Sequence, residues 1–199
     1  AGHWLLANGA QVRLSTRVGQ ITEADNGIDI DGANFAAAII ATAPQHIGAL
    51  WPAAATNFAY EPIATVYLKF GPKIKTPFPL SNRLGEHCQW IVDRGNGLLA
   101  CVLSGHGDWE SFDDETLAAT LEAELALPEA ASWHKVIREK RATFSATPGL
   151  HRPDCKTSKP HIFLAGDYTW ADYPATLEGA VRSGQRAARY VERTFLRHA

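Results

Sequence analysis

Alternation of hydrophobic and polar positions predicts short β-strands near the start of the chain. Residues 11–14 and 17–21 alternate as half-buried strands do. Asp25-Asn26-Gly27 predicts a turn, and residues 28–30 a short returning strand. Residues 35–42 are apolar nearly throughout, which predicts a strand that is covered on both faces.

The middle of the chain has the pattern of an antiparallel sheet with one helix. Runs rich in β-branched, aromatic and aliphatic residues predict four strands: 64–70, 89–93, 98–104 and 135–144. The glycines within residues 94–97 predict a hairpin turn between the second and third of these strands. Residues 113–127 are amphipathic and begin with acidic residues, as expected of a helix whose dipole favours negative charge at its start.

The last fifty residues return to the pattern of a buried strand followed by a helix. Residues 161–165 form a short apolar run that stops at Gly166-Asp167, and a helix is predicted over 177–196. Its small and apolar positions recur with a period of 3.6 residues: Leu177, Ala180, Val181, Gly184, Ala187, Ala188, Val191 and Phe195. We expect this face to lie against a sheet or a cofactor, and ordinary helix–sheet packing is the alternative.

Composition narrows the class of protein. The 199 residues are enough for one domain or two small ones, and a net charge of −2 excludes a sequence-wide basic field for nucleic acid, so no nucleic-acid partner is expected. Three widely spaced cysteines and no histidine–glutamate zinc motif predict a reducing, cytoplasmic compartment and no metal site. No apolar run approaches the length of about 20 residues that spans a bilayer.

The turn at Gly166-Asp167 carries the clearest chemistry. Ligands of open α/β sheets bind outside the carboxyl ends of the strands, where a carboxylate can accept hydrogen bonds from sugar-like hydroxyls. Gly166 lets a ligand approach the backbone closely. The start of the next helix offers unpaired N–H groups and a positive dipole end, which can stabilise negative charge on a reduced ring.

The run LAGDYT, followed by YPATLEGAVRSGQRAA, closely resembles the C-terminal flavin motif of the amine oxidase and carotenoid desaturase superfamily. The resemblance implies FAD as cofactor and places Gly166 and Asp167 at its ribityl or phosphate region. It also implies that Val18 meets the adenine, and that Ala43 belongs to the strand and turn that follow. The residues implied at the pyrimidine end of the flavin are Thr176, Leu177, Glu178, Gly179 and Ala180.

Residues 60–68, 89–95 and 141–149 narrow the resemblance to the squalene-associated FAD-dependent desaturases, also called hydroxysqualene dehydroxylases. This implies a hydrophobic isoprenoid substrate and removal of its allylic hydroxyl to give squalene, or desaturation of a related polyene. Such a substrate dissolves in membranes, so peripheral contact with the inner face of the membrane is expected.

The resemblance also implies an α/β plus α+β architecture. Residues 1–45 and 149–199 would form part of an FAD-binding domain, and 46–148 an inserted antiparallel-sheet domain for substrate. No GxGxxG phosphate loop occurs and the chain does not begin with Met, so we interpret it as a C-terminal fragment that binds FAD weakly or not at all. Half a flavin site leaves apolar surface exposed, which predicts self-association into a homo-oligomer.

Two other functions fit part of the pattern. A flavin amine oxidase shares the motif, and a non-catalytic remnant or interaction module fits the missing phosphate loop. Spacing identifies no partner for any histidine, so no catalytic residue is assigned. Arginines along the last helix predict a solvated face, with an anionic membrane surface as the alternative: Arg182, Arg186, Arg189, Arg193 and Arg197. Trp90, Trp170 and Tyr173 could line a substrate tunnel or belong to the core.

Overall fold

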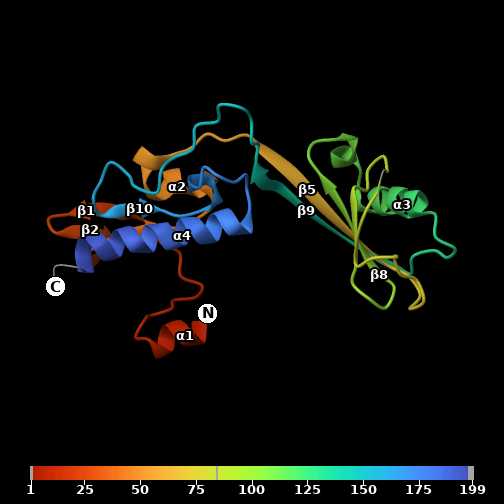
Figure 1. Ribbon diagram of the computed structural model, residues 1–199, viewed down its shortest axis with the longest axis horizontal. Coiled ribbons are helices and arrows are strands. Elements are labelled where there is room, and N and C mark those ends of the chain that lie inside the picture. The colour runs from red at the N-terminus through yellow and green to blue at the C-terminus, as the bar shows by residue number, and fades with distance from the viewer. Residues whose placement is uncertain (1, 84, 197–199) are drawn as a thin grey trace. The chain divides into compact units, whose positions relative to one another are not determined.

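The computed structural model describes residues 2–83 and 85–196. The chain divides into two compact units (Figure 1). Unit 1 consists of Ala1–Phe58 and Ala146–Ala199, and unit 2 is the segment between them, Ala59–Ser145. The sequence predicts unit boundaries after residues 45 and 148. The structure places the second boundary close to its predicted position, but the first lies after Phe58, so residues 46–58 belong to unit 1.

Unit 2 is built on a five-stranded sheet in which every neighbouring pair is antiparallel. Its strands, in spatial order, are β6 (Leu80–Asn82), β7 (Trp90–Asp93), β8 (Leu98–Ser104), β5 (Tyr60–Lys69) and β9 (Trp133–Phe144). The structure confirms the four predicted strands and the hairpin between β7 and β8. The short strand β6 was not predicted, because three residues carry too little pattern to identify a strand.

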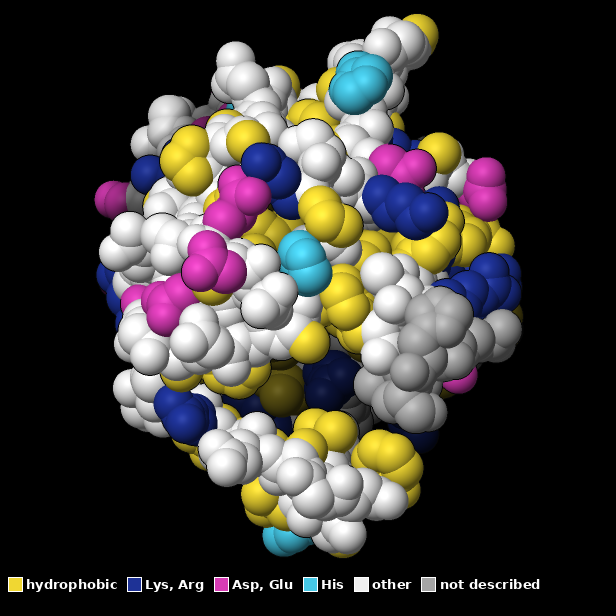
Figure 2. Space-filling model, turned by 90° about the vertical axis from the view of Figure 1, so that its left-hand side faces the viewer, with side chains coloured by type: hydrophobic (Ala, Val, Ile, Leu, Met, Phe, Trp, Pro, Cys, Tyr) yellow, Lys and Arg dark blue, Asp and Glu magenta, His cyan; other side chains and the backbone are white. Residues whose placement is uncertain are grey.

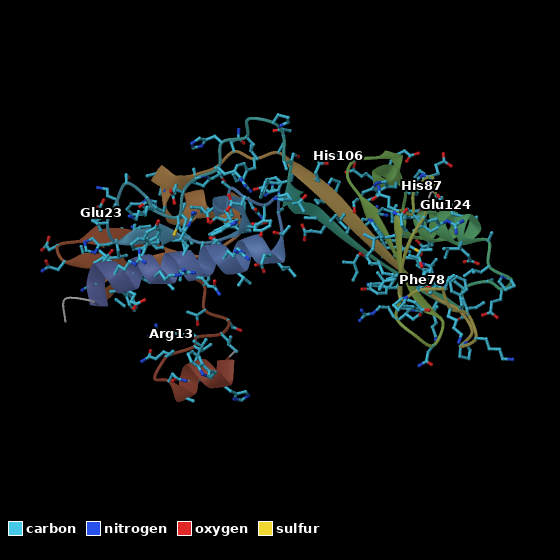
Figure 3. The ribbon with its side chains drawn as sticks, viewed as in Figure 1. Arg13, Glu23, Phe78, His87, His106 and Glu124 are labelled. Carbon is cyan, nitrogen blue, oxygen red and sulfur yellow. The ribbon has the colours of Figure 1, made fainter. Side chains whose placement is uncertain are left out.

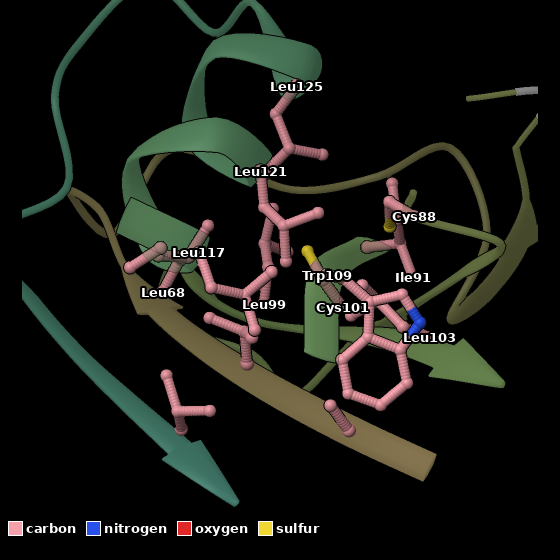
Figure 4. Close-up of a cluster of buried hydrophobic side chains, with 14 of the residues drawn as sticks. Leu68, Cys88, Ile91, Leu99, Cys101, Leu103, Trp109, Leu117, Leu121 and Leu125 are labelled. Carbon is pink, nitrogen blue, oxygen red and sulfur yellow. The ribbon is translucent and has the colours of Figure 1, made fainter. Parts of the chain in front are cut away.

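The helix α3 (Asp114–Leu125) closes the core of unit 2 (Figure 4). Along β5, alternate side chains are buried, and Val66 pairs with Cys101 on one side and Val136 on the other. Leu117, Leu121 and Leu125 of α3 are buried with them. The carboxylate of Asp113 accepts a hydrogen bond from the backbone N–H of Thr116 at 2.7 Å, which caps the helix start.

Unit 1 contains two small sheets. Strands β1 (Ile21–Ala24), β2 (Gly27–Ile30) and β3 (Ala33–Phe35) form an antiparallel sheet, and the predicted turn at Asp25-Asn26-Gly27 is confirmed. Strands β4 (Ala38–Ile40) and β10 (Ile162–Leu164) pair in parallel. The short 3₁₀ helix η3 (Asp167–Thr169) follows β10.

Three strand predictions in unit 1 differ from the structure. The strands predicted at 11–14 and 17–21 are absent except for Ile21, where β1 begins. Residues 10–20 are exposed and form no strand, because no strand of the described chain pairs with them; Gly19 and Gln20 instead donate backbone hydrogen bonds to the carboxylate of Asp31. The predicted strand over 35–42 is two strands, since Phe35 pairs with Ile28 in β3. Nor is its second half covered on both faces, because Ile39 of β4 is 41% exposed.

The other α-helices of the described chain lie in unit 1, together with two short helical turns. They are α1 (Gly2–Ala7), α2 (Pro44–Leu50), the 3₁₀ turn η1 (Pro52–Ala54) and α4 (Leu177–Val191), which continues into the π-helical turn η4 (Glu192–Leu196). In unit 2 a 3₁₀ turn, η2 (Asp108–Ser111), precedes α3. No helix within the described residues is long and apolar enough to cross a membrane.

Helix α4 packs through a face that overlaps the expected one only in part. Its buried residues are Gly179, Ser183 and Ala187, and Ala187 joins Phe163 of β10 in a small core cluster. Of the predicted face, Val191 and Phe195 also pack against this cluster, so the prediction is confirmed for the C-terminal half of the helix. Other members are open: Leu177 is 88% exposed, Val181 is 55% exposed, and Ala188 is exposed as well.

Candidate functional site

The carboxyl ends of two neighbouring parallel strands meet at one edge of unit 1. Leu164 of β10 is in register with Ile40 of β4, and the backbone N–H of Ala165 donates to the carbonyl of Ile40 at 3.0 Å. The chain therefore leaves β4 through residues 41–43 and β10 through Gly166-Asp167 at the same edge. This edge is where ligands of parallel sheets bind.

The turn after β10 is fixed from two sides. A Cβ atom added to Gly166 would lie 2.2 Å from Cε1 of Tyr168, so only glycine fits beneath that buried ring. The Gly166 N–H donates to Oγ of Ser183 on α4 at 3.0 Å. Glycine is therefore required here to pack the turn, and α4 holds that turn in place.

Asp167 lies directly beside the start of α4. A Cβ atom added to Gly179 would be 3.8 Å from Cα of Asp167 and 3.7 Å from Cβ of Tyr173. The Asp167 carboxylate accepts a hydrogen bond from the backbone N–H of Tyr168 at 2.9 Å. Burial raises the pKa of this carboxyl above its usual value, with the hydrogen bond acting in the opposite direction. A ligand group that donates to the carboxylate would relieve that cost.

The first turn of α4 presents free backbone donors. Oγ1 of Thr176 accepts from the Gly179 N–H at 3.0 Å, and the Thr176 carbonyl accepts from Ala180 at 3.1 Å. The N–H groups of Leu177 and Glu178 have no acceptor in the described part of the chain. The Glu178 carboxylate binds Arg182 at 2.6 Å, so its side chain is an ordinary ion-pair partner on the helix surface. This helix start can therefore bind a ligand through the backbone N–H groups of Leu177 and Glu178 and through the positive end of its dipole.

A pocket of about 760 Å³ lies against β4 and contains Val18. Arg17, Ile39, Thr42 and Leu50 also line it. Oγ1 of Thr42 is buried and has no hydrogen-bond partner among the described residues. Buried polar atoms in proteins almost always have a partner, so this hydroxyl indicates a missing polar group in a mostly apolar pocket.

Ala43 and the predicted aromatic residues occupy different surroundings. Ala43 is exposed at the start of α2, one residue beyond the pocket lining. Trp170 lies next to α4, where the guanidinium of Arg186 is 5.0 Å from its ring. Trp90 belongs to β7 of unit 2 and is partly exposed. The pocket of unit 1 that Trp170 lines does not have Tyr173 in its lining.

Unit 2 contains a charged pair that the sequence did not reveal. Nδ1 of His87 lies 2.5 Å from Oε1 of Glu124, and both side chains are largely buried (Figure 3). The hydrogen bond to Glu124 raises the pKa of His87. On the surface, His106 pairs with Glu110 at 2.9 Å. Glu124 follows His87 by 37 residues, a separation that no spacing rule detects.

A comparison with protein families decides the assignment. The sequence model of the family of flavin-containing amine oxidoreductases matches residues 4–192, nearly the whole chain. The chain belongs to this family. Members of this family are described as flavin-containing. The family match therefore confirms the flavin cofactor that the Gly166-Asp167 motif predicts.

Relatives within the family are hydroxysqualene dehydroxylases. The chain is 33% identical over 159 residues to that of Rhodopseudomonas palustris, covering 76% of this chain and 37% of the relative. It is 31% identical over 194 residues to that of Sinorhizobium fredii, covering 90% of this chain and 46% of the relative. The chain thus spans less than half the length of these relatives.

The fold also has a match among solved structures. A putative protoporphyrinogen oxidase from an Exiguobacterium species superimposes with a TM-score of 0.68 at 15% identity, covering 93% of this chain and 48% of that one. At this identity the likeness shows the fold alone, a mixture of sheets and helices found in an oxidoreductase.

Proposed function

We propose that the protein to which this chain belongs is an FAD-dependent oxidoreductase that acts on a long isoprenoid, removing an allylic hydroxyl to give squalene. The observation that carries the proposal is the contact between Asp167 and the start of α4 at the carboxyl edge of the β4–β10 sheet. Similarity to two hydroxysqualene dehydroxylases supports the substrate class.

The residues at this edge fit an FAD molecule in three respects. Asp167 supplies a half-buried carboxylate for hydroxyl groups, and the amides of Leu177 and Glu178 supply free donors. The pocket beside β4 supplies apolar walls and the unpartnered hydroxyl of Thr42. A ring system with a sugar-like chain needs these three kinds of contact.

In this proposal each group of residues holds a different part of the cofactor. Val18 and the pocket beside β4 would hold the adenine end, and Asp167 the ribityl or phosphate region. The start of α4, Thr176 to Ala180, would face the pyrimidine end. Ala43 would lie at the rim between β4 and α2.

The bound flavin would supply hydride transfer, and the chain's own residues would hold and polarise it. The positive end of α4 favours negative charge beside the Leu177 and Glu178 amides, so it would make the ring easier to reduce. Thr176 orients this helix start by capping the Gly179 N–H, and Gly166 lets the turn that carries Asp167 pack against the Tyr168 ring.

The two units would then have separate roles. Unit 1 would be part of an FAD-binding domain, and unit 2 an inserted antiparallel-sheet domain that binds the hydrophobic substrate. Exposed apolar side chains support contact with a membrane surface or with a second copy of the protein, among them Leu14, Phe78, Leu177 and Val181. Figure 2 shows such side chains at the surface of one face, with a hollow between them.

The test is a turnover assay on the full-length protein with FAD bound and a reductant supplied. Hydroxysqualene should be converted to squalene, identified by mass spectrometry. In a separate assay without reductant and without oxygen, primary amines should leave the flavin oxidised. Reduction of the flavin by amines without conversion of hydroxysqualene would contradict the proposal and favour an amine oxidase. Neither reaction, in a protein that retains FAD, would favour a non-catalytic role.

A further inference from the structure

The outward face of α4 carries a basic pocket that the flavin site does not use. It encloses about 320 Å³, within the range of small-ligand sites, and lies between α4 and Trp170. Four arginines, one helical turn apart, line it: Arg182, Arg186, Arg189 and Arg193. The fifth arginine of the predicted stripe, Arg197, lies outside the described residues.

Charge is unbalanced in this pocket. Glu178 neutralises Arg182 at 2.6 Å, and Asp154 lies 3.5 Å from Arg186. For Arg189 and Arg193 no ion pair exists with any carboxylate in the described ranges, and no acidic residue is part of the lining that the structure describes. Like charges brought together on one wall repel one another, so an anion between them is favourable.

Two residues that line this pocket each carry a buried N–H donor with no acceptor among the described residues. Nε1 of Trp170 and Nε of Arg186 are buried and have no hydrogen-bond partner within the part of the chain described. Arg186 is nevertheless held firmly, because its Nη2 donates to the Thr169 carbonyl at 2.7 Å and its guanidinium lies 5.0 Å from the centre of the Trp170 ring. These contacts fix the position of the Arg186 guanidinium, while its Nε–H has no acceptor among the described residues.

We infer that this pocket binds a phosphate group, either of a free phosphate or diphosphate or of an anionic lipid headgroup. A phosphate offers several strong acceptor oxygens and up to two negative charges, which match the convergent arginines and the two unpartnered donors. A water molecule would accept from one donor but leave the positive charge unbalanced. The inference is independent of the flavin site, which uses the start of α4 rather than this face.

Isothermal titration with inorganic diphosphate, and flotation with vesicles, separate the two sources. We expect saturable binding either of diphosphate or of phosphatidylglycerol vesicles, weaker at high salt, and none of phosphatidylcholine vesicles. Binding of diphosphate assigns a soluble ligand, and binding of phosphatidylglycerol alone assigns a lipid. Binding of neither, or equal binding of phosphatidylcholine, overturns the inference.

Matched variants test the site itself. R186K keeps the charge but removes Nε, and W170F keeps an aromatic side chain but removes Nε1, so each should weaken binding about tenfold. The double variant R189Q/R193Q changes two exposed side chains and should abolish binding without unfolding, as circular dichroism would show. The control is R94Q, in the β7–β8 turn of unit 2. If R94Q weakens binding as much as R186K, the attraction is general charge and the inference fails.

Discussion

The two units bury their apolar residues to different extents. Unit 2 encloses its core between a five-stranded sheet and α3, so Leu68, Leu103 and Leu121 are fully buried (Figure 4). Unit 1 has a sheet of only two parallel strands at its centre, and Ile39 and Leu177 are left open. Unit 2 buries its apolar side chains in its own core. Unit 1 leaves some of its apolar side chains exposed, where a ligand or another part of the protein can cover them.

This difference explains where the polar groups lack partners. In unit 1 the Thr42 hydroxyl and the Trp170 and Arg186 donors are buried without partners among the residues described. In unit 2 the largely buried Glu124 carboxylate is used fully, accepting from the backbone of His87 and Cys88 at 3.1 Å each. Counting Nε1 of Trp51, unit 1 holds four such unpartnered atoms among the described residues, whereas unit 2 holds one, Nε2 of His87, which lies 3.2 Å from the carboxylate of Asp108.

The largest expected effect is a loss of stability when a buried leucine of unit 2 is truncated, compared with an exposed leucine of unit 1. Leu121→Ala removes a fully buried side chain from unit 2 and should lower the free energy of unfolding by about 2–5 kcal/mol. Leu177→Ala makes the same chemical change on the open face of α4 and should alter stability by less than about 0.5 kcal/mol. Urea unfolding followed by circular dichroism measures both. Similar losses in the two variants would mean that α4 is covered as fully as the core of unit 2.

A smaller effect is expected at the turn after β10. Gly166→Ala places a methyl group against the Tyr168 ring and should destabilise unit 1 by about 1–3 kcal/mol. Gly184→Ala is the matched control, because its added methyl group meets nothing within 4 Å and should raise helix stability by up to about 1 kcal/mol. Thermal unfolding of both variants distinguishes these signs. A neutral Gly166→Ala would show that the turn is loose.

The smallest effect is a pH dependence that His87 gives to unit 2. Hydrogen bonding to Glu124 raises the pKa of folded His87 above the unfolded value of about 6.5. Its contribution to stability is therefore complete below that value and is lost as the pH rises through the folded pKa. Melting temperatures from pH 5 to pH 9 should fall across this window, and His87→Gln should flatten the fall.

Local patterns predicted the parts of the fold that depend on neighbouring residues. The turn at Asp25-Asn26-Gly27 and the start of α4 were predicted because their turn and capping residues lie within a few positions of one another. Residues 11–14 alternate equally well, yet form no strand, since a ladder needs a partner that the described chain does not provide. Alternation alone therefore does not establish a strand.

Sites that join distant residues could be predicted only in part. The flavin motif includes both Asp167 and Gly179, which are twelve residues apart in the sequence, and the structure places them side by side. By contrast, the pairing of His87 with Glu124 depends on how α3 packs on the sheet. The arginine stripe was predicted, but the Trp170 wall that makes it a pocket comes from the preceding loop.

Flavin content of the full-length protein tests the central claim most directly. Asp167→Asn removes the charge that would accept hydrogen bonds from the cofactor, while Asp172→Asn makes the same change at an exposed position in the same loop. Loss of one charged hydrogen bond should weaken FAD binding about tenfold to a hundredfold, measured as flavin absorbance per protein during titration. We predict this loss for Asp167→Asn alone. Unchanged FAD affinity in Asp167→Asn would contradict the assignment of this edge as a flavin site.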